Sequence, residues 1–251
     1  MTRTSGRATT IDTLFEGRLA LEQPEKADRV AIDAVFLAAA VPAQDGDRVL
    51  DLGTGVGSAA LCLAFRAPGS RVVGIDRRAD VIALARSNAA RAGFTDRVRF
   101  VPGDVAAPAA GAPFDHVMAN PPYFRAGRGR VSPDPARAAA RTEAGATLAD
   151  WIVAALAAVR VGGSITFIHL AERLDELLEG LGRGAGSIAV LPLVPKPGAA
   201  ASRVLVRAVK GATGGTVIAP GLVLHEADGR YTAAADAVLR GAAPVALGET
   251  P

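Results

Sequence analysis

Hydrophobic residues gather into short, nearly continuous runs along the chain. Such runs, when rich in β-branched residues, are typical of strands covered on both faces, as in a parallel sheet. They predict five strands: RVLDLG (48–53), RVVGID (71–76), VRFVPGD (98–104), FDHVMAN (114–120) and SITFIHL (164–170), the last beginning after a stop at Gly162-Gly163.

Segments with helical periodicity follow most of these runs. They are SAALCLAFRA (58–67), ADVIALARSNAARAG (79–93), TLADWIVAALAAVRVGG (147–163) and AERLDELLEGLGR (171–183). Strands that alternate with helices form right-handed βαβ units and a doubly wound sheet. The pattern therefore predicts an α/β fold with a mostly parallel sheet.

The rhythm changes after Gly186. Two apolar runs, SIAVLPLVP (187–195) and ASRVLVRAVKG (201–211), flank the turn-rich KPGAA with no helix between them. Such a pair is typical of an antiparallel hairpin. Added to the five parallel strands, it makes the predicted sheet seven-stranded, with the hairpin at its edge.

The two ends of the chain are less patterned. The first ten residues, MTRTSGRATT, are predicted to be a loose tail. Residues 15–43 are predicted to form an extension with one strand, GRLALEQP, and one helix that Asp33 caps. Near the C-terminus, Thr232 is expected to cap a helix. We expect residues 1–251 to form a single domain with a core at about 47–210, and the segment 211–251 carries no assigned role.

Composition narrows the class of protein. Half of the 251 residues are hydrophobic, yet no apolar run is long enough to span a bilayer, and the N-terminus lacks the apolar stretch of a signal peptide. The single cysteine, Cys62, allows no internal disulfide and suits a reducing compartment, so we expect a cytoplasmic protein. The three scattered histidines form no recognisable zinc motif, and neither a metal nor a membrane partner is expected.

Three alternating glycines, Gly53, Gly55 and Gly57, lie where the first predicted strand turns into a helix. Glycine permits positive φ and close approach of a ligand, and a helix N-terminus favours negative charge. A purely structural turn is one alternative, and a dinucleotide site is another, but the latter needs G-x-G-x-x-G, whereas Ser58 follows the third glycine here. The G-x-G-x-G spacing after Asp51 resembles the first motif of class I S-adenosylmethionine-dependent methyltransferases.

Acidic residues end the next two predicted strands. Asp76 follows the glycines by about 20 positions, where a carboxylate can accept both hydroxyls of a ribose. Asp104 ends the third strand, where it can meet the amino group of an adenine. Either could instead cap the following helix. Together with the glycines, they predict a nucleoside-containing cofactor at the carboxyl edge of the sheet.

The fourth predicted strand ends in Asn120-Pro121-Pro122-Tyr123. Two prolines fix φ twice and remove two donors, so the turn is rigid and neither strand nor helix continues through it. Acceptors at the Asn120 side-chain oxygen and the Pro121 carbonyl would orient an exocyclic amine, favour a pyramidal nitrogen and point its lone pair at a sulfonium methyl group. Tyr123 offers a face on which a flat substrate, such as a flipped-out base, can stack.

In this order and spacing, DLGTGVG, GID, GDV and NPPY resemble the amino-methyltransferases that modify adenine, cytosine or glutamine nitrogens, over roughly residues 47–170. The flanking segments 17–43 and 137–163 resemble the bacterial tRNA(Val) adenine N6-methyltransferase family, although the sequence before the first helix, DRVAIDAV, departs from that family's aromatic-arginine pattern. The resemblance implies a Rossmann-like methyltransferase fold, S-adenosylmethionine as cofactor and tRNA as partner. It implies catalytic roles for Asn120, Pro121 and Tyr123, and cofactor contacts by Asp51, Gly53, Gly55, Gly57, Asp76, Asp104 and Asn120.

The segment after NPPY indicates the class of substrate. FRAGRGRVSPDPARAAAR contains five arginines and a single acidic residue, and arginine pairs well with phosphate, so Phe124, Arg125, Arg128 and Arg130 are predicted to contact RNA beside Tyr123. The alternative is a solvated loop in an arginine-rich chain whose net charge is only +3. A ribosomal RNA methyltransferase, a release-factor glutamine methyltransferase and, more remotely, a non-catalytic nucleotide-binding module remain alternative functions.

Overall fold

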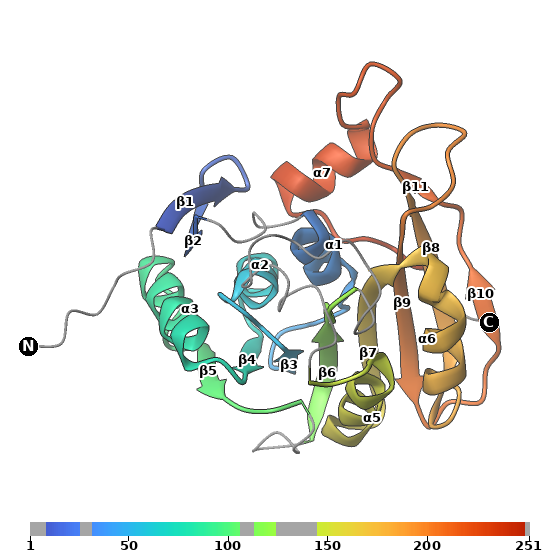
Figure 1. Ribbon diagram of the computed structural model, residues 1–251, viewed down its shortest axis with the longest axis horizontal. Helices are drawn as coiled ribbons and strands as arrows, with labels where there is room; N and C mark the ends of the chain where they lie inside the picture. Colours follow the sequence, from blue (N-terminus) through green and yellow to red (C-terminus); the bar gives the residue numbers. More distant parts are fainter. Residues whose placement is uncertain (1–8, 26–31, 106–112, 124–144, 249–251) are drawn as a thin grey trace, which may run out of the picture.

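A computed structural model describes residues 9–25, 32–105, 113–123 and 145–248 of the chain. Its centre is a nine-stranded sheet (Figure 1). The strands follow the order β10-β8-β9-β7-β6-β3-β4-β5, and β11 also pairs with β8; β8 is Ala185–Val194, β9 Arg203–Lys210, β10 Thr216–Ile218 and β11 Leu222–Val223. Five neighbouring strands run parallel: β3 (Arg48–Leu52), β4 (Arg71–Asp76), β5 (Val98–Pro102), β6 (Phe114–Ala119) and β7 (Val159–Leu170). These are the five strands that the apolar runs predict.

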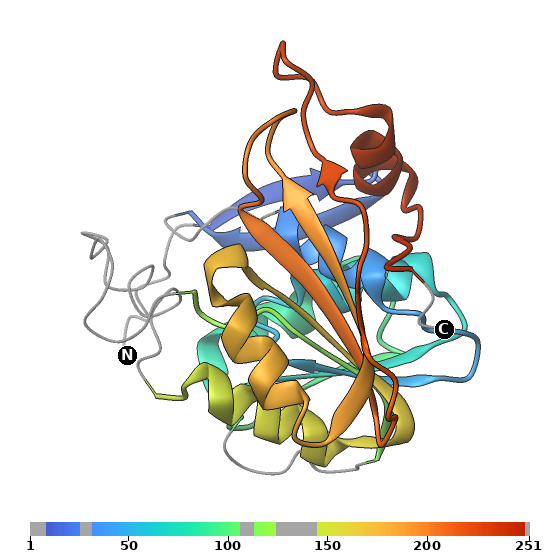
Figure 2. The ribbon, with the colours of Figure 1, turned by 90° about the vertical axis from the view of Figure 1, so that its right-hand side faces the viewer.

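Helices cover both faces of this sheet, as the alternating pattern requires. One face packs against α1 (Ile32–Ala40), α2 (Ser58–Arg66), α3 (Ala79–Arg91) and α7 (Ala233–Gly241). The other face packs against α5 (Leu148–Ala158) and α6 (Leu174–Leu181), which follows a short 3-10 turn, η1 (Ala171–Arg173). Figure 2 shows α6 and α7 on opposite sides of the C-terminal strands. Successive residues of one strand enter different cores: Val49 faces the α2 side and Leu50 the α5 side. The doubly wound fold is confirmed.

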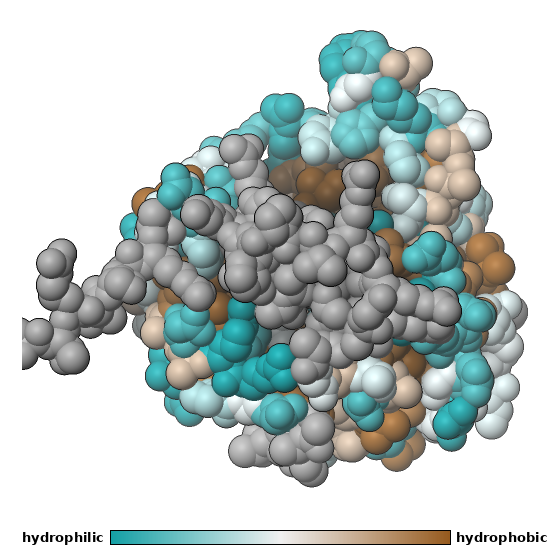
Figure 3. All heavy atoms as spheres, viewed as in Figure 1, coloured by the Kyte–Doolittle hydropathy of each residue, from teal (hydrophilic) through white to brown (hydrophobic). Residues whose placement is uncertain are grey.

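The C-terminal hairpin is also confirmed, but the sheet has nine strands rather than the predicted seven, and the hairpin does not form its edge. β8 (Ala185–Val194) and β9 (Arg203–Lys210) pair antiparallel, and β9 joins the parallel strands through β7. Two short strands that the sequence did not predict, β10 (Thr216–Ile218) and β11 (Leu222–Val223), pair in succession along the outer side of β8. Helix α7 follows, capped by Thr232 as predicted. The loop before it, residues 226–230, is exposed and forms the hydrophilic tip at the top of Figure 3.

The boundary between α5 and β7 differs from the prediction. The helix ends at Ala158, and β7 starts at Val159 rather than at Ser164, so Gly162-Gly163 lies inside the strand. The pairing of β6 with β7 shifts register opposite this glycine pair, Gly162 has φ +75°, and a Cβ on Gly163 would lie 2.5 Å from the Asp115 carbonyl oxygen. The glycines therefore form a bulge where two backbones approach closely.

The N-terminal segment forms its own small sheet. β1 (Thr9–Leu14) pairs antiparallel with the predicted strand β2 (Leu19–Pro24), so the strand-forming segment begins at Thr9 and the expectation of a loose tail through Thr10 was wrong. Asp33 lies within the first turn of α1 rather than before it, so it is not the cap of this helix, and its carboxylate accepts a hydrogen bond from the Tyr123 hydroxyl instead. Cys62 is buried. Within the described ranges, no helix is long and apolar enough to cross a membrane.

Candidate active site

The carboxyl ends of four adjacent parallel strands bring the predicted site residues to one edge of the sheet. Leu52 of β3 pairs with both Ile75 of β4 and Ala119 of β6. The glycine loop begins one residue after Leu52, Asp76 follows Ile75, and Asn120 follows Ala119. The glycines, the Asp76 carboxylate and the Asn120 amide are therefore neighbours, although up to 67 positions separate Gly53 from Asn120 in the chain (120 − 53 = 67).

Glycine is required at the three positions of the loop for different structural reasons. All have positive φ, +66° at Gly53, +56° at Gly55 and +88° at Gly57. A Cβ on Gly53 would lie 2.2 Å from the Trp151 ring, and one on Gly57 would lie 2.6 Å from the Phe100 ring, so packing alone excludes a side chain at these two positions. A Cβ on Gly55 would meet nothing within 4 Å. Gly55 is thus the position where the loop backbone faces open space that a ligand can enter.

Asp51 lies beneath this loop and holds it. Its carboxylate accepts a hydrogen bond of 2.6 Å from the Thr54 hydroxyl and another from the Ala60 backbone, while only 2 % of the residue is exposed. Burial raises the pKa of Asp51 from 3.8 to about 7, the bonds from Thr54 and Ala60 lower it, and the nearby Asp76 carboxylate raises it further. Because Gly57 at the N-cap of α2 has no capping side chain, Asp51 supplies an acceptor to the first turn of this helix from outside it.

Asp76 fixes the open part of the loop. Its Oδ2 accepts a hydrogen bond of 3.1 Å from the Gly55 amide, and its Oδ1 accepts one of 2.9 Å from the Arg78 amide. Oδ1 also lies 3.5 Å from Nε of Arg78. An ionised carboxylate has about four acceptor positions, so Oδ2 keeps one for a further donor. Asp104 lies two residues beyond the end of β5 and is exposed at the same edge.

Sequence reasoning missed Asn88, which ties the loop to the N-terminal hairpin. The fully buried side chain donates to the carbonyl oxygens of Val56, at 3.0 Å, and Glu22, at 2.9 Å, and accepts from the Glu22 amide at 2.8 Å. A signal was present, because Asn88 falls on the buried face of α3 together with Ile82 and Ala85. A polar residue on such a face needs buried partners.

The turn after β6 brings Asn120 and Tyr123 together with charges from distant segments. Asn120 is partly exposed. The Tyr123 hydroxyl donates to Asp33 of α1, and the Arg203 guanidinium of β9 lies over the Tyr123 ring, 4.5 Å from its centroid. Burial and the Asp33 carboxylate raise the pKa of Tyr123, whereas Arg203 lowers it. At neutral pH the phenol is therefore protonated and donates its hydrogen bond.

A second layer lies behind Tyr123. His169, which is fully buried, makes an edge contact with the Tyr123 ring at 5.4 Å between centroids. Burial lowers the pKa of His169 from 6.5 to about 4, and the positive charge of Arg173 lowers it further. Arg173 donates to the Tyr123 carbonyl oxygen at 3.4 Å and forms a two-pronged ion pair with Glu176. The imidazole is thus neutral at physiological pH and does not act as a cation here.

The predicted RNA contacts beyond Tyr123 cannot be placed in this way. Phe124, Arg125, Arg128 and Arg130 lie outside the described residues. Across the part of the chain that is described, no group of three or more His, Cys, Asp or Glu residues could hold a metal ion.

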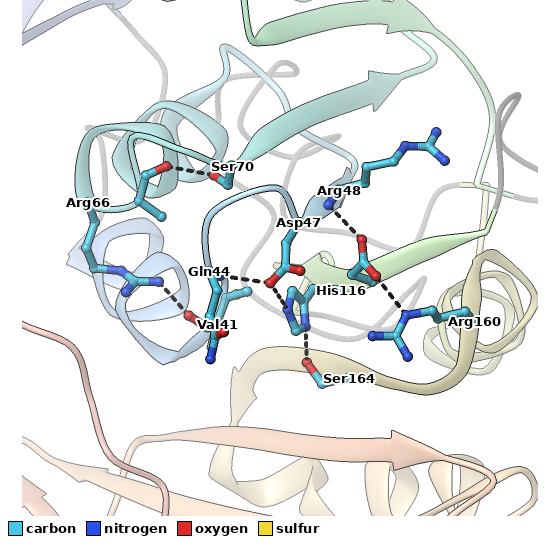
Figure 4. A network of polar contacts seen from close by, with 11 residues as sticks. Val41, Gln44, Asp47, Arg48, Arg66, Ser70, His116, Arg160 and Ser164 are labelled. Carbon is cyan, nitrogen blue, oxygen red and sulfur yellow. Dashed lines mark hydrogen bonds and ion pairs between the residues drawn. The ribbon is translucent and has the colours of Figure 1, made fainter.

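A separate polar network lies at the opposite, amino edge of the sheet (Figure 4). His116 contacts Asp47 at 3.0 Å through Nε2 and Ser164 at 2.8 Å through Nδ1. Burial lowers the pKa of His116, although the bond to Asp47 raises it. Only 5 % of Ser164 is exposed, so this Asp-His-Ser arrangement joins the beginnings of the parallel strands and does not present a nucleophile.

Known proteins resemble this chain in sequence and in fold. A family model described as the methyltransferase small domain matches residues 26–150. The tRNA1(Val) (adenine(37)-N6)-methyltransferase of Aeromonas hydrophila is 31% identical over 206 residues, which are 81% of this chain and 85% of that protein. The chain belongs to this methyltransferase family. Its members use S-adenosylmethionine as the methyl donor.

Two further comparisons concern a second methyltransferase type and a solved structure. The release factor glutamine methyltransferase of Chlorobaculum tepidum is 43% identical, but over only 91 residues, 35% of this chain and 31% of that protein. A crystal structure described as that of a predicted O-methyltransferase from Agrobacterium tumefaciens superposes with a TM-score of 0.70 at 28% identity, over 85% of this chain and 98% of the other. The fold is therefore that of a Rossmann-like S-adenosylmethionine-dependent methyltransferase throughout the described sheet.

The geometry of this methyltransferase site fits the cofactor. A nucleoside cofactor needs a close backbone approach and an acceptor for ribose hydroxyls. The open space at Gly55 and the Asp76 carboxylate meet these needs at one edge of the sheet.

Proposed function

We propose that this methyltransferase transfers the methyl group of S-adenosylmethionine to an exocyclic amino nitrogen, namely N6 of an adenine in tRNA. The observation that carries the proposal is the pairing of β3 with β6, which sets the NPPY turn directly beside the glycine loop. The family relationship supports tRNA as the substrate. In this proposal residues 1–251 act as a single methyltransferase domain in the cytoplasm, with RNA as the partner.

The cofactor is held, in this proposal, by the loop from Gly53 to Gly57, by Asp76 at the ribose and by Asp104 at the adenine, with Asp51 as a further contact that positions the loop. When bound, S-adenosylmethionine supplies an electrophilic methyl group on a sulfonium sulfur. The protein's task is then to bring an amine to that methyl group in the correct orientation and to exclude water.

Asn120 and Pro121 orient the amine. The Asn120 side-chain oxygen and the Pro121 carbonyl accept hydrogen bonds from its two N–H groups, which favours a pyramidal nitrogen whose lone pair faces the methyl group. The nitrogen–carbon bond forms as the sulfur–carbon bond breaks, and the sulfur keeps the electron pair of the broken bond. The extra proton on the nitrogen passes to solvent after the transfer. The side chain of Tyr123 provides the stacking surface for the base, with Phe124, Arg125, Arg128 and Arg130 as further contacts to the RNA.

Labelled methyl transfer tests this function. The protein is incubated with labelled S-adenosylmethionine in three separate reactions, which contain total tRNA, ribosomal RNA or peptide release factors. The modified nucleoside or amino acid is then identified. N6-methyladenosine in tRNA is the expected product. Label in ribosomal RNA or on a glutamine would replace tRNA as the substrate, and the absence of any transfer would contradict the function.

The two asparagines of the chain provide a matched comparison. Asn120→Ala should lower the single-turnover rate at saturating cofactor about 10²- to 10³-fold, the scale expected for one preorganised hydrogen-bonding group. Its affinity for RNA should stay near that of the wild type, because phosphate contacts supply most of that affinity. Asn88→Ala should instead weaken cofactor binding, because the glycine loop loses its anchor at Val56.

A further inference from the structure

Three side chains from distant parts of the sequence meet at Tyr123 in the proposed active site. Asp33 belongs to α1, Arg203 to the first position of β9, and Tyr123 to the turn after β6. The Tyr123 hydroxyl donates to Oδ2 of Asp33, and Nε of Arg203 lies 3.4 Å from the same oxygen. The Arg203 guanidinium also covers one face of the Tyr123 ring. One carboxylate thus binds both the phenol and the guanidinium.

Burial makes this arrangement costly to keep unless each member has its partner. Only 8 % of Asp33 is exposed, and a buried carboxylate is tolerated where it is paired and hydrogen-bonded. Arg203 supplies the opposite charge, and Tyr123 supplies the hydrogen bond. His169 also contacts the Tyr123 ring, and Arg173 donates a hydrogen bond to the Tyr123 backbone carbonyl oxygen. Tyr123 is therefore held at its hydroxyl, at one face and at its backbone before any substrate is present.

The geometry points to Asp33 and Arg203 as positioning residues for methyl transfer, an inference that rests on the proposed function. They fix the Tyr123 ring in one orientation, so that the surface on which the base stacks is ordered in advance beside Asn120. Because Arg203 occupies one face, the ring leaves at most one face for the base. Neither Asp33 nor Arg203 touches the reacting atoms in this mechanism. Their effect on the rate passes through Tyr123.

A double-mutant cycle separates positioning from general support of the fold. Asp33→Asn keeps the volume but loses the charge, and Tyr123→Phe keeps the ring but loses the bond. Each should lower the single-turnover rate about tenfold, as expected for the loss of one hydrogen bond to a charged group. The double variant should be clearly less than about a hundredfold slower, because both changes act on the one hydrogen bond between Tyr123 and Asp33. Cofactor affinity should not change in any of them.

Arg203→Ala tests the second contact. If the guanidinium positions the ring, the rate should fall and the KM for RNA should stay the same or rise. A lower KM would overturn the inference for Arg203, because it would mean that the guanidinium competes with the base for the ring. Arg203→Lys retains the charge but not the planar group, and should recover part of the rate.

A spectroscopic measurement makes the test independent of the substrate. The chain has two tyrosines, Tyr123 and Tyr231, so ring-labelled tyrosine gives two sets of NMR signals, and Tyr123→Phe assigns them. Asp33→Asn should shift the Tyr123 signals and leave those of Tyr231 in place. Asp47→Asn is the matched control, because it removes a carboxylate that bonds to His116 at the opposite edge of the sheet. It should change neither the Tyr123 signals nor the rate.

The outcomes distinguish this inference from the proposed function. Unshifted Tyr123 signals in Asp33→Asn, additive rate effects in the cycle, or a parallel loss of cofactor affinity would overturn the positioning role. Transfer by the wild type to a glutamine rather than to tRNA would overturn the proposed substrate, while the same cycle on that substrate would still decide what Asp33 and Arg203 do.

Discussion

The indole ring of Trp151 fills the space beside Gly53 that any larger residue would need, since a Cβ on Gly53 would lie 2.2 Å from Cη2 of Trp151. Trp151 comes from α5, on the far side of the sheet from α2, and 7 % of it is exposed. The first glycine of the loop is therefore held by packing from below, while Gly55 faces open space. Packing thus requires a glycine at position 53, whereas the space beside Gly55 is open.

Alanine at these two positions should have different effects. Gly53→Ala combines an unfavourable φ, about 1–2 kcal/mol, with overpacking against Trp151, about 1–3 kcal/mol, and should mainly lower the free energy of unfolding. Gly55→Ala has only the backbone cost, and its methyl group enters the open space, so cofactor affinity should fall most in this variant. Thermal unfolding and calorimetric titration measure the two effects. Equal cofactor affinity of Gly55→Ala and wild type would place the cofactor elsewhere.

Trp151 also provides a direct signal for the loop. It is the single tryptophan of the chain, and its ring touches the loop that we expect to bind the cofactor. Binding of S-adenosylmethionine should therefore change the intrinsic tryptophan fluorescence, and Trp151→Phe should abolish the signal. A titration without any fluorescence change, while calorimetry reports binding, would contradict a cofactor site at this loop.

Local patterns sufficed for much of this site. The apolar runs predicted all five parallel strands, and the order of strands in a doubly wound sheet then brought the glycines, Asp76 and Asn120 to one edge. Trp151 is buried in the core. Its contact with Gly53 was not predicted, because 98 positions separate the two residues and nothing local to either specifies the other (151 − 53 = 98).

The parts that the sequence did not predict share this cause. Asp33 resembled a helix cap, since an aspartate near a helix start often has that role, but Tyr123, 90 positions away, determines its partner. Val159 was assigned to a helix because it continues an apolar helical pattern. Its pairing with Phe114 of β6 extends the strand instead, which is a tertiary contact overriding a local preference.

The arginine-rich segment after Tyr123 should account for much of the salt dependence of RNA binding. Arg125→Gln together with Arg128→Gln removes two of the proposed phosphate contacts and should reduce the slope of log affinity against log salt by about 1.4–2. Cofactor affinity should not change. Arg71→Gln with Arg183→Gln is the control, because both of these arginines are exposed and lie at or near the amino edge of the sheet. Equal slopes in the two double variants would leave the segment without a role in RNA binding.

Asp51 should make the stability of the protein depend on pH in an unusual direction. Its pKa is raised in the folded protein from 3.8 to about 7, chiefly by burial. Between these two values the folded state binds more protons than the unfolded state, so this residue's contribution to the free energy of unfolding falls as the pH rises from about 4 to about 7. The ordinary salt-bridged aspartate has the opposite dependence.

Asp51→Asn isolates this contribution. Asparagine keeps an acceptor for Thr54 and Ala60 and cannot ionise, so the variant should gain stability relative to wild type as the pH rises from about 4 to about 7, by an amount on the order of a few kcal/mol. The difference between the two proteins is the quantity to measure, by urea unfolding at several pH values. Burial lowers the pKa of His169 to about 4, so its contribution to the free energy of unfolding rises with pH over the same range. Both proteins contain His169, so its contribution cancels in the difference between them. A difference that stays constant from pH 4 to 8 would mean that Asp51 titrates normally and that its carboxylate is not held in the buried position beneath the loop.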